Sequence, residues 1–214
     1  MTLFRLDASI RSEGSVSRAL ADVVEASWRA ARPEAPVTHR DLGLEPLDAR
    51  AWALAVGAGR QDPATRSPEQ RAAVDLAAGL VDELLDADAL LFAAPLYNFG
   101  VSQHVKTWVD LVLTDPRLAA SGDRPLAGRP AVAVVVRGGA YGPGTPREGW
   151  DHASGWIRRI LADVWGLDLR VVEREFTLVG VNPALDEFTE LAATMRHEAE
   201  RLAAEHGRHL ARVR

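Results

Sequence analysis

The sequence predicts an α/β fold, in which a doubly wound, five-stranded parallel sheet carries helices on both faces. Two observations predict it. Short apolar segments alternate with longer amphipathic ones along the 214 residues, an order typical of β-α-β units. Residues 88–95 and 130–136 are almost continuously apolar, as in central parallel strands that are covered on both sides. A chain of this length suits one domain, which we expect to span residues 1–214.

The first half of the chain supplies two expected strands and one helix before a long loop. Residues 2–8 form the first expected strand, which runs into a serine-rich loop. Residues 17–31 place Leu20, Val24 and Trp28 on one helical face. A second strand is expected at 36–41, and residues 42–66 are expected to be irregular.

The remaining elements follow in the same alternation. A helix is expected at 67–86, because Ser67 is a good N-cap followed by Pro68 and by Gln70 in the capping-box position. Expected strands at 88–95, 130–136 and 169–179 alternate with expected helices at 101–113, 149–164 and 185–206. In such sheets the ligand lies beyond the carboxyl ends of the strands, which directs attention to the loops at 8–17, 42–66, 95–101 and 136–149.

Composition excludes several classes of function. The net charge of −5 leaves no broad basic field for a nucleic-acid partner. The chain has no cysteine, which excludes a disulfide scaffold, a thiolate nucleophile and a cysteine-ligated zinc. The first residues lack the long apolar segment of a secretory signal, and no apolar run is long enough to cross a bilayer. We therefore expect a cytoplasmic protein with no membrane partner.

The loop after the first expected strand suits a phosphate. Ser9, Ser15 and Ser17 offer hydroxyl groups, and the following helix offers free N–H groups and the positive end of its dipole. Neither GxGxxG nor GxxxxGK[ST] is present, which disfavours a dinucleotide fingerprint and a P-loop. The loop therefore fits a terminal phosphomonoester such as that of FMN, although an ordinary turn with a serine N-cap explains the same residues.

The loop after the third expected strand suits a flat ring. It reads Pro95-Leu96-Tyr97-Asn98-Phe99, so two aromatic rings and an amide follow a buried strand directly. Such residues can supply apolar contact to an isoalloxazine and hydrogen bonds to its polar edge. A proline-initiated turn whose aromatic rings cover the end of the sheet is the alternative.

Three pieces of the chain, in this order, carry a resemblance to a known family. They are Ser9-Ile10 with Ser15-Val16-Ser17, then Ala94 to Phe99, then Arg137-Gly138-Gly139. The chain resembles the flavodoxin-like FMN-dependent NADH-azoreductases and NAD(P)H:quinone oxidoreductases. The Pro-x-Tyr-Asn-Phe piece is the most specific part of the match.

The resemblance implies the roles of particular residues in binding FMN. The phosphate and ribityl chain would contact the first loop, and the ring would rest on the third-strand loop. The pyrimidine edge would meet the fourth-strand loop, where glycines permit a close approach of the flavin edge. The implied cofactor-binding residues are Ser9, Ser15, Val16, Ser17, Pro95, Leu96, Tyr97, Asn98, Phe99, Val136, Arg137, Gly138 and Gly139. Tyr141 and Trp52 are expected to contact the substrate.

The resemblance also implies an activity. NADH or NADPH would reduce bound FMN, and a quinone or azo compound would then accept two electrons at the same face, in a homodimer. No side-chain acid or base and no metal ligand is assigned. Ser102, His104 and Asp110 lie on one expected helix that Ser102 caps, so they do not form a hydrolase triad.

The chain departs from the family pattern at three places. Val136 and Val16 stand where the family usually has serine and glutamine, and residues 114–128 contain no aromatic side chain. Two alternatives to the enzyme stay open. One is a flavodoxin-type electron carrier, which would oxidise NADH negligibly. The other is an FMN-binding module without turnover, or one that has lost its flavin.

Overall fold

The computed structural model describes residues 1–212 and has the expected alternation of strands and helices. The strands are β1 (Leu3–Asp7), β2 (Val37–Asp41), β3 (Ala89–Tyr97), β4 (Gly100–Val101), β5 (Pro130–Val136) and β6 (Asp168–Arg174). The helices are α1 (Val16–Ala31), α2 (Arg50–Ala58), α3 (Pro68–Leu85), α4 (Gln103–Val112), α5 (Ser154–Arg158) and α6 (Thr189–Leu210). Three short helical segments complete the chain: η1 (Pro63–Thr65), η2 (Arg159–Val164) and η3 (Pro183–Phe188).

The sheet confirms the expected fold class. Five strands pair in parallel in the order β2-β1-β3-β5-β6, and the two-residue β4 pairs antiparallel with the end of β3. The connections from β1 lead first to β2 at one edge and then across to β3 on the other side. This reversal of direction creates the crevice at the carboxyl ends of β1 and β3 in which ligands of such sheets bind.

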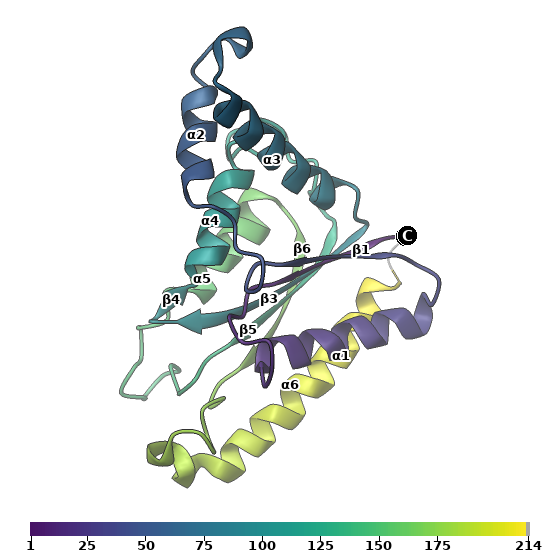
Figure 1. Cartoon of the computed structure of the whole chain (residues 1–214). Coiled ribbons are helices and arrows are strands. Elements are labelled where there is room, and N and C mark those ends of the chain that lie inside the picture. Colours follow the sequence, from purple (N-terminus) through teal and green to yellow (C-terminus); the bar gives the residue numbers. More distant parts are fainter. Residues whose placement is uncertain (213–214) are drawn as a thin grey trace.

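Helices cover both faces of the sheet, and each face has its own apolar core. Helices α1 and α6 lie side by side on one face, and α3, α4 and α5 lie on the other with α2 beside α3 (Figure 1). Every residue of β5 is buried, as is nearly all of β3, which explains their continuous apolar sequences. Trp28 of α1 lies in one core, and Trp108 and Trp165 lie in the core on the opposite face.

Helix boundaries follow local capping. Ser15 caps α1 by accepting a hydrogen bond from the N–H of Arg18, and Ser67 and Gln70 form the predicted capping box of α3. Ser102 caps α4 through the N–H of Val105, which confirms its structural role.

The expected boundaries were wrong at three places, and the last helix also runs from Thr189 to Leu210 rather than from 185 to 206. Residues 42–66 are not irregular, because they contain the alanine-rich helix α2. At its start the Asp48 carboxylate accepts a hydrogen bond from the N–H of Arg50 at 2.9 Å, a start signal that the sequence prediction did not use. The helix expected from residue 149 begins only at Ser154, after Gly149 with φ +77°. The strand expected at 169–179 ends at Arg174, because Phe176 adopts φ +54° and turns the chain over the neighbouring loop.

No helix within residues 1–212 is both long and apolar enough to cross a membrane.

Candidate functional site

The three predicted loops meet at the carboxyl ends of β1, β3 and β5, where they line a cavity of about 270 Å³. We call it the strand-end cavity. Its walls come from the loop before α1, the last residues of β3, the residues that follow β5, and the segment after β6. The lining residues are Ser9, Arg11, Gly14, Ser15, Val16, Ser17, Pro95, Leu96, Tyr97, Val136, Gly138, Thr177 and Leu178.

The first wall is the amino end of α1. Ser9, Ser15 and Ser17 are buried, and the hydroxyl oxygens of Ser15 and Ser17 lie 3.3 Å apart. Gly14 adopts φ +64°, which bends the loop into the helix start. The hydroxyl groups, the first-turn N–H groups and the positive end of the helix dipole therefore face one small volume. Such an arrangement binds phosphate.

A guanidinium group fixes this loop from behind. Arg18 donates to both carboxylate oxygens of Asp41, to the carbonyl of Ser9 at 2.8 Å and to the carbonyl of Arg11 at 2.9 Å. Burial opposes ionisation of Asp41, but the Arg18 hydrogen bond and two backbone N–H groups outweigh it and hold the pKa of this carboxyl below its ordinary value. The loop is therefore held by an ion pair that itself lies outside the cavity lining.

Gly43 lets the chain after β2 pass this loop closely. A Cβ at Gly43 would lie 1.8 Å from the carbonyl oxygen of Ser9, a separation that no side chain permits. The backbone N–H of Gly43 also donates to Asp41 at 3.0 Å. Glycine is required here by close approach, so the position of Ser9 depends on a residue that the sequence analysis did not single out.

The second wall is the end of β3. Pro95, Leu96 and Tyr97 present an apolar surface, and the phenol oxygen of Tyr97 lies 3.3 Å from both the hydroxyl of Ser9 and the N–H of Ile10. The two neighbouring strands are thus joined across the top of the sheet. A flat apolar wall next to a polar, serine-lined corner matches a ring system that carries a phosphorylated tail.

Asn98 and Phe99 turn away from the cavity lining. They have φ values of +47° and +69° and form the two-residue turn between Tyr97 and Gly100, which pair across β3 and β4. The ring of Phe99 meets Trp150 edge-on at 5.3 Å and Tyr141 at 6.4 Å between centroids. An aromatic cluster of Phe99, Tyr141 and Trp150 therefore lies beside the turn.

The third wall contains Val136 and Gly138, but the side chain of Arg137 points elsewhere. Its guanidinium contacts Asp151 at 2.6 Å, Glu173 at 2.8 Å and Glu175 at 3.5 Å. Burial alone would raise the pKa values of Asp151 and Glu173, yet their hydrogen bonds and the arginine charge lower both. The buried Arg137 side chain therefore pairs with carboxylates rather than facing the strand-end cavity.

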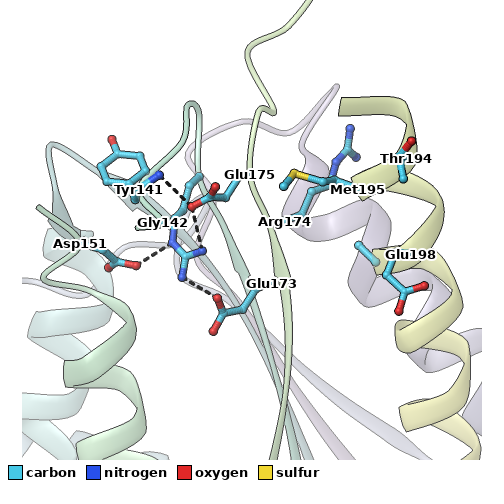
Figure 2. A pocket seen from close by; sticks show the side chains of 11 residues that line it. Tyr141, Gly142, Asp151, Glu173, Arg174, Glu175, Thr194, Met195 and Glu198 are labelled. Atoms are coloured by element: carbon cyan, nitrogen blue, oxygen red, sulfur yellow. Dashed lines mark hydrogen bonds and ion pairs between the residues drawn. The ribbon is translucent and has the colours of Figure 1, made fainter. Parts of the chain in front are cut away.

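This ion-pair network borders a second, wider cavity of about 510 Å³ between the sheet and α6 (Figure 2). The carboxylates of Asp151, Glu173 and Glu175 point toward the Arg137 guanidinium. The Arg174 side chain extends toward Met195 of α6 instead. The lining of this wider cavity has more carboxylates than arginines, which disfavours a phosphate, and it lacks the hydroxyl cluster at a helix start. It suits a phosphorylated ring less well than the strand-end cavity does.

Gly138 makes room for the protein itself. A Cβ at Gly138 would lie 2.6 Å from Cδ1 of Leu178, whose N–H donates to the carbonyl of Gly138 at 3.1 Å. Thr177 bonds the carbonyl of Arg137 in the same way at 3.1 Å. The close neighbour of Gly138 in this structure is Leu178, and the expectation that this glycine admits a flavin edge stays a prediction.

Sequence reasoning missed four of the lining residues: Arg11, Gly14, Thr177 and Leu178. Thr177 and Leu178 were hidden because residues 169–179 look like one strand, and only the positive φ of Phe176 reveals the turn. Gly14 carried a signal, since a glycine directly before a serine N-cap commonly marks a left-handed turn. Arg11 could also have been predicted, because it is a cationic residue in a loop that was expected to bind phosphate.

The two expected substrate contacts lie in different places. Tyr141 is beside Phe99 and lines the wider cavity, and its backbone N–H donates to Glu175 at 2.9 Å. Trp52 lies on α2, where it lines a separate hollow with Asp110 and Leu113 of α4. The structure therefore brings Tyr141, but not Trp52, to the neighbourhood of the predicted cofactor residues.

One carboxylate cluster has the spacing of a metal site. Ligand atoms of Asp7, His39 and Asp41 lie within 4.8 Å of one another. Oδ2 of Asp7 already meets Nε2 of His39 at 2.8 Å and the Arg5 guanidinium at 2.9 Å, and Asp41 is paired with Arg18. Asp7 and Asp41 therefore already form ion pairs with Arg5 and Arg18. The absence of a bound metal stays a prediction.

Comparison with known proteins decides the family. A family model described as flavodoxin-like fold matches residues 1–199. An FMN-dependent NADH:quinone oxidoreductase of Frankia alni is 40% identical over 200 residues, which cover 92% of this chain and 94% of that protein. The protein of the same name from Streptomyces avermitilis is 37% identical over 211 residues, covering 98% and 97%.

The chain belongs to the family of flavodoxin-like FMN-dependent NADH:quinone oxidoreductases.

Solved structures agree with this family at the level of the fold. The azoreductase AzrA superposes with a TM-score of 0.75 at 19% identity, over 98% of this chain and 100% of that one. An FMN-dependent NADH-azoreductase from Bacillus anthracis, in complex with FMN, gives 0.72 at 17% identity over 95% and 98%. The resemblance inferred from the serine loop and the Pro-x-Tyr-Asn-Phe piece is therefore confirmed, and the roles of individual residues in this family member stay predictions.

Proposed function

We propose that this chain is an FMN-dependent NADH oxidoreductase that reduces quinones, azo compounds or both. The observation that carries the proposal is the strand-end cavity, in which the serine-lined amino end of α1 adjoins the apolar wall of Pro95 to Tyr97. The curated relatives, which are named for this activity and match nearly the whole chain, support it.

The residues of the cavity fit FMN. Ser15 and Ser17, with the free N–H groups of the first turn of α1, would hold the phosphate. Leu96 and Tyr97 would lie against the ring, while Val136 and Gly138 border its edge. Bound FMN would supply the two-electron redox chemistry, which none of the side chains of the site can supply.

The protein's own contribution is binding and orientation. The Arg18–Asp41 pair and the contact of Tyr97 with Ser9 keep the phosphate loop and the end of β3 in a fixed relation before any ligand arrives. Such preorganisation reduces the ordering cost of binding. No side chain in the cavity lining is arranged as an acid–base pair, so we assign no proton donor.

The acceptor would approach from the side of the aromatic cluster. Phe99 and Trp150 are 38% and 50% exposed and stand beside the turn that ends β3. Planar acceptors such as quinones stack on aromatic rings, so these side chains and Tyr141 are suited to contact them. The absence of aromatic residues at 114–128 leaves this cluster as the aromatic surface nearest the turn.

We propose further that the enzyme works as a homodimer in the cytoplasm, the location expected from the sequence. Ile10 in the phosphate loop and Leu44 after β2 are 60% and 59% exposed, and with Phe99 and Trp150 they leave apolar side chains uncovered. A second copy of the chain would cover them. Light scattering on the purified protein tests this, and a monomeric mass at micromolar concentration contradicts it.

Anaerobic addition of NADH to the purified, flavin-loaded protein tests the main proposal. We expect bleaching of the yellow absorbance, followed by steady NADH oxidation when a quinone is added. A flavin that stays oxidised in the presence of NADH would instead favour an electron carrier. A colourless protein that takes up no added FMN would favour a module that has lost its flavin.

A further inference from the structure

Arg11 is the one charged side chain among the described residues that line the strand-end cavity. The other lining residues are glycines, hydroxyl residues, and apolar or aromatic residues. No carboxylate lines the cavity within residues 1–212, so an anion in it would meet no like charge there. Glu13 belongs to the same loop but is exposed to solvent and lies outside the lining.

The guanidinium of Arg11 is not committed to another group. Its backbone N–H donates to the hydroxyl of Ser9 at 3.2 Å, and its carbonyl accepts from Nε of Arg18 at 2.9 Å. The backbone of Arg11 is therefore fixed at the rim of the cavity. Within the part of the chain that the structure describes, its side chain forms no ion pair or hydrogen bond.

Arg174 and Arg196 border a neighbouring hollow of the same loop but do not line the strand-end cavity. Arg18, which contacts the loop, cannot take the same role. It is saturated by Asp41 and by the carbonyls of Ser9 and Arg11. Freeing it would leave Asp41 without its partner and would loosen the loop. Arg11 is therefore the arginine of this loop region that lines the strand-end cavity itself.

We infer that Arg11 is the residue that makes this site selective for a phosphorylated flavin over its unphosphorylated counterpart. The serine hydroxyls and the N–H groups of α1 are neutral donors, whereas a phosphomonoester carries close to two negative charges at neutral pH. A planar guanidinium pairs with phosphate oxygens through two hydrogen bonds and adds a full charge. Riboflavin, which has the same ring and ribityl chain without the phosphate, gains nothing from this contact. The inference rests on the proposed binding of FMN.

Flavin titration tests this role. FMN and riboflavin are titrated separately into flavin-free protein, and binding is followed by quenching of flavin fluorescence. For Arg11→Gln we expect FMN affinity to fall about tenfold, the effect of roughly one exposed charge-assisted contact. The affinity for riboflavin should stay within about twofold of that of the unsubstituted protein. Arg11→Lys should fall between the two, because it keeps the charge but loses the paired hydrogen bonds.

A charge-matched control separates the local contact from net charge. Arg60 is exposed near the end of α2 and lines the separate hollow of Trp52, so Arg60→Gln changes the net charge equally but should leave FMN affinity unchanged. Raising the salt concentration should also weaken FMN binding less steeply in Arg11→Gln than in the unsubstituted protein.

The outcomes divide clearly. If Arg11→Gln leaves FMN affinity unchanged, or weakens FMN and riboflavin equally, the selectivity role is wrong even though the protein binds flavin. If the unsubstituted protein binds neither flavin, the proposed function fails together with this inference.

Discussion

At the scale of single residues, Ser15 contributes both to the start of α1 and to the wall of the strand-end cavity. Its hydroxyl caps α1 through the N–H of Arg18 and also lies 3.3 Å from the hydroxyl of Ser17 in the cavity wall. Ser17 is inside the first turn and has no part in the cap. Loss of Ser15 therefore affects both helix stability and the phosphate site, whereas loss of Ser17 affects the site alone.

We predict that replacing both serines with alanine weakens FMN binding by a few kcal/mol at most, on the order of one to two for each lost charge-assisted hydrogen bond. Flavin titration measures the affinity, and urea unfolding measures stability. Ser67→Ala is the matched control, because it removes the cap of α3 at a cost of about 1 kcal/mol without touching the strand-end cavity. Unchanged FMN affinity in the double variant would contradict the assignment of the phosphate.

At the scale of elements, the turn between β3 and β4 stores backbone strain. Its positive φ values suit asparagine at position 98, but a bulky side chain at the second position is unusual, and glycine is normally preferred there. Phe99 nevertheless occupies it and contacts Trp150 and Tyr141. Strain kept at such a place is typical of a functional site, which is consistent with a role in contacting the acceptor.

The strain predicts an unusual order of stabilities. Phe99→Gly and Phe99→Ala both remove the ring, but only glycine accepts the left-handed conformation without cost. We expect the glycine variant to be more stable than the alanine variant by about 1 kcal/mol, the reverse of the usual preference. Urea unfolding of the two variants measures the difference, and an alanine variant of equal or greater stability would show that the turn is unstrained.

The packing of α1 against α6 depends on a glycine. A Cβ at Gly207 would lie 2.3 Å from the carbonyl oxygen of Val24 and 2.8 Å from Cβ of Ser27, so the two helices touch through their backbones. We predict that Gly207→Ala forces them apart and lowers the free energy of unfolding by ~1–3 kcal/mol. In Gly79→Ala, by contrast, the exposed position on α3 has open space, so the same change should stabilise by ~0.5–1 kcal/mol. Thermal melts of the two variants that move in the same direction would refute this packing.

At the scale of the whole molecule, alternation of apolar periodicity was enough to predict the sheet. The signal is strongest in β3 and β5, because burial on both faces leaves almost unbroken apolar runs there, whereas the edge strands β2 and β6 are partly polar. Strong caps fixed the start of α3 within a residue. Helix α2 was not predicted because its alanine-rich sequence has few large apolar residues, although Asp48 bonds the N–H of Arg50 at its start.

Only those parts of the candidate site that have a recognisable local sequence could be predicted. The serine loop and the end of β3 carry their own signals, and the strand order brings them together. The contacts of Gly43 with Ser9 and of Leu178 with Gly138 are tertiary, so nothing in the neighbouring sequence announces them. The direction of the Arg137 side chain likewise depends on Asp151, Glu173 and Glu175, which become its neighbours only after folding.

Two sets of groups make the stability of the molecule depend on pH. Glu25, Asp41, Asp151 and Glu173 have pKa values below their ordinary ones, since their hydrogen bonds and ion pairs with arginine outweigh burial. Their stabilisation is complete above the ordinary carboxyl pKa and is lost as pH falls through the lower, folded values.

His206 is a buried residue of α6, and desolvation, with repulsion from Arg170, lowers its pKa below the ordinary 6.5. His206 therefore affects the free energy of unfolding over a different pH range from the carboxylates. Because the unfolded chain takes up the histidine proton first, the free energy of unfolding should decline as pH falls below about 6.5, before the carboxylates begin to titrate. We predict that His206→Gln, which carries no titrating group, flattens the stability profile between about pH 7 and pH 5 and leaves the steeper acid loss below about pH 4.5 in place. Urea unfolding at closely spaced pH values measures both windows. A variant whose decline between pH 7 and 5 matches that of the unsubstituted protein would show that other groups carry it.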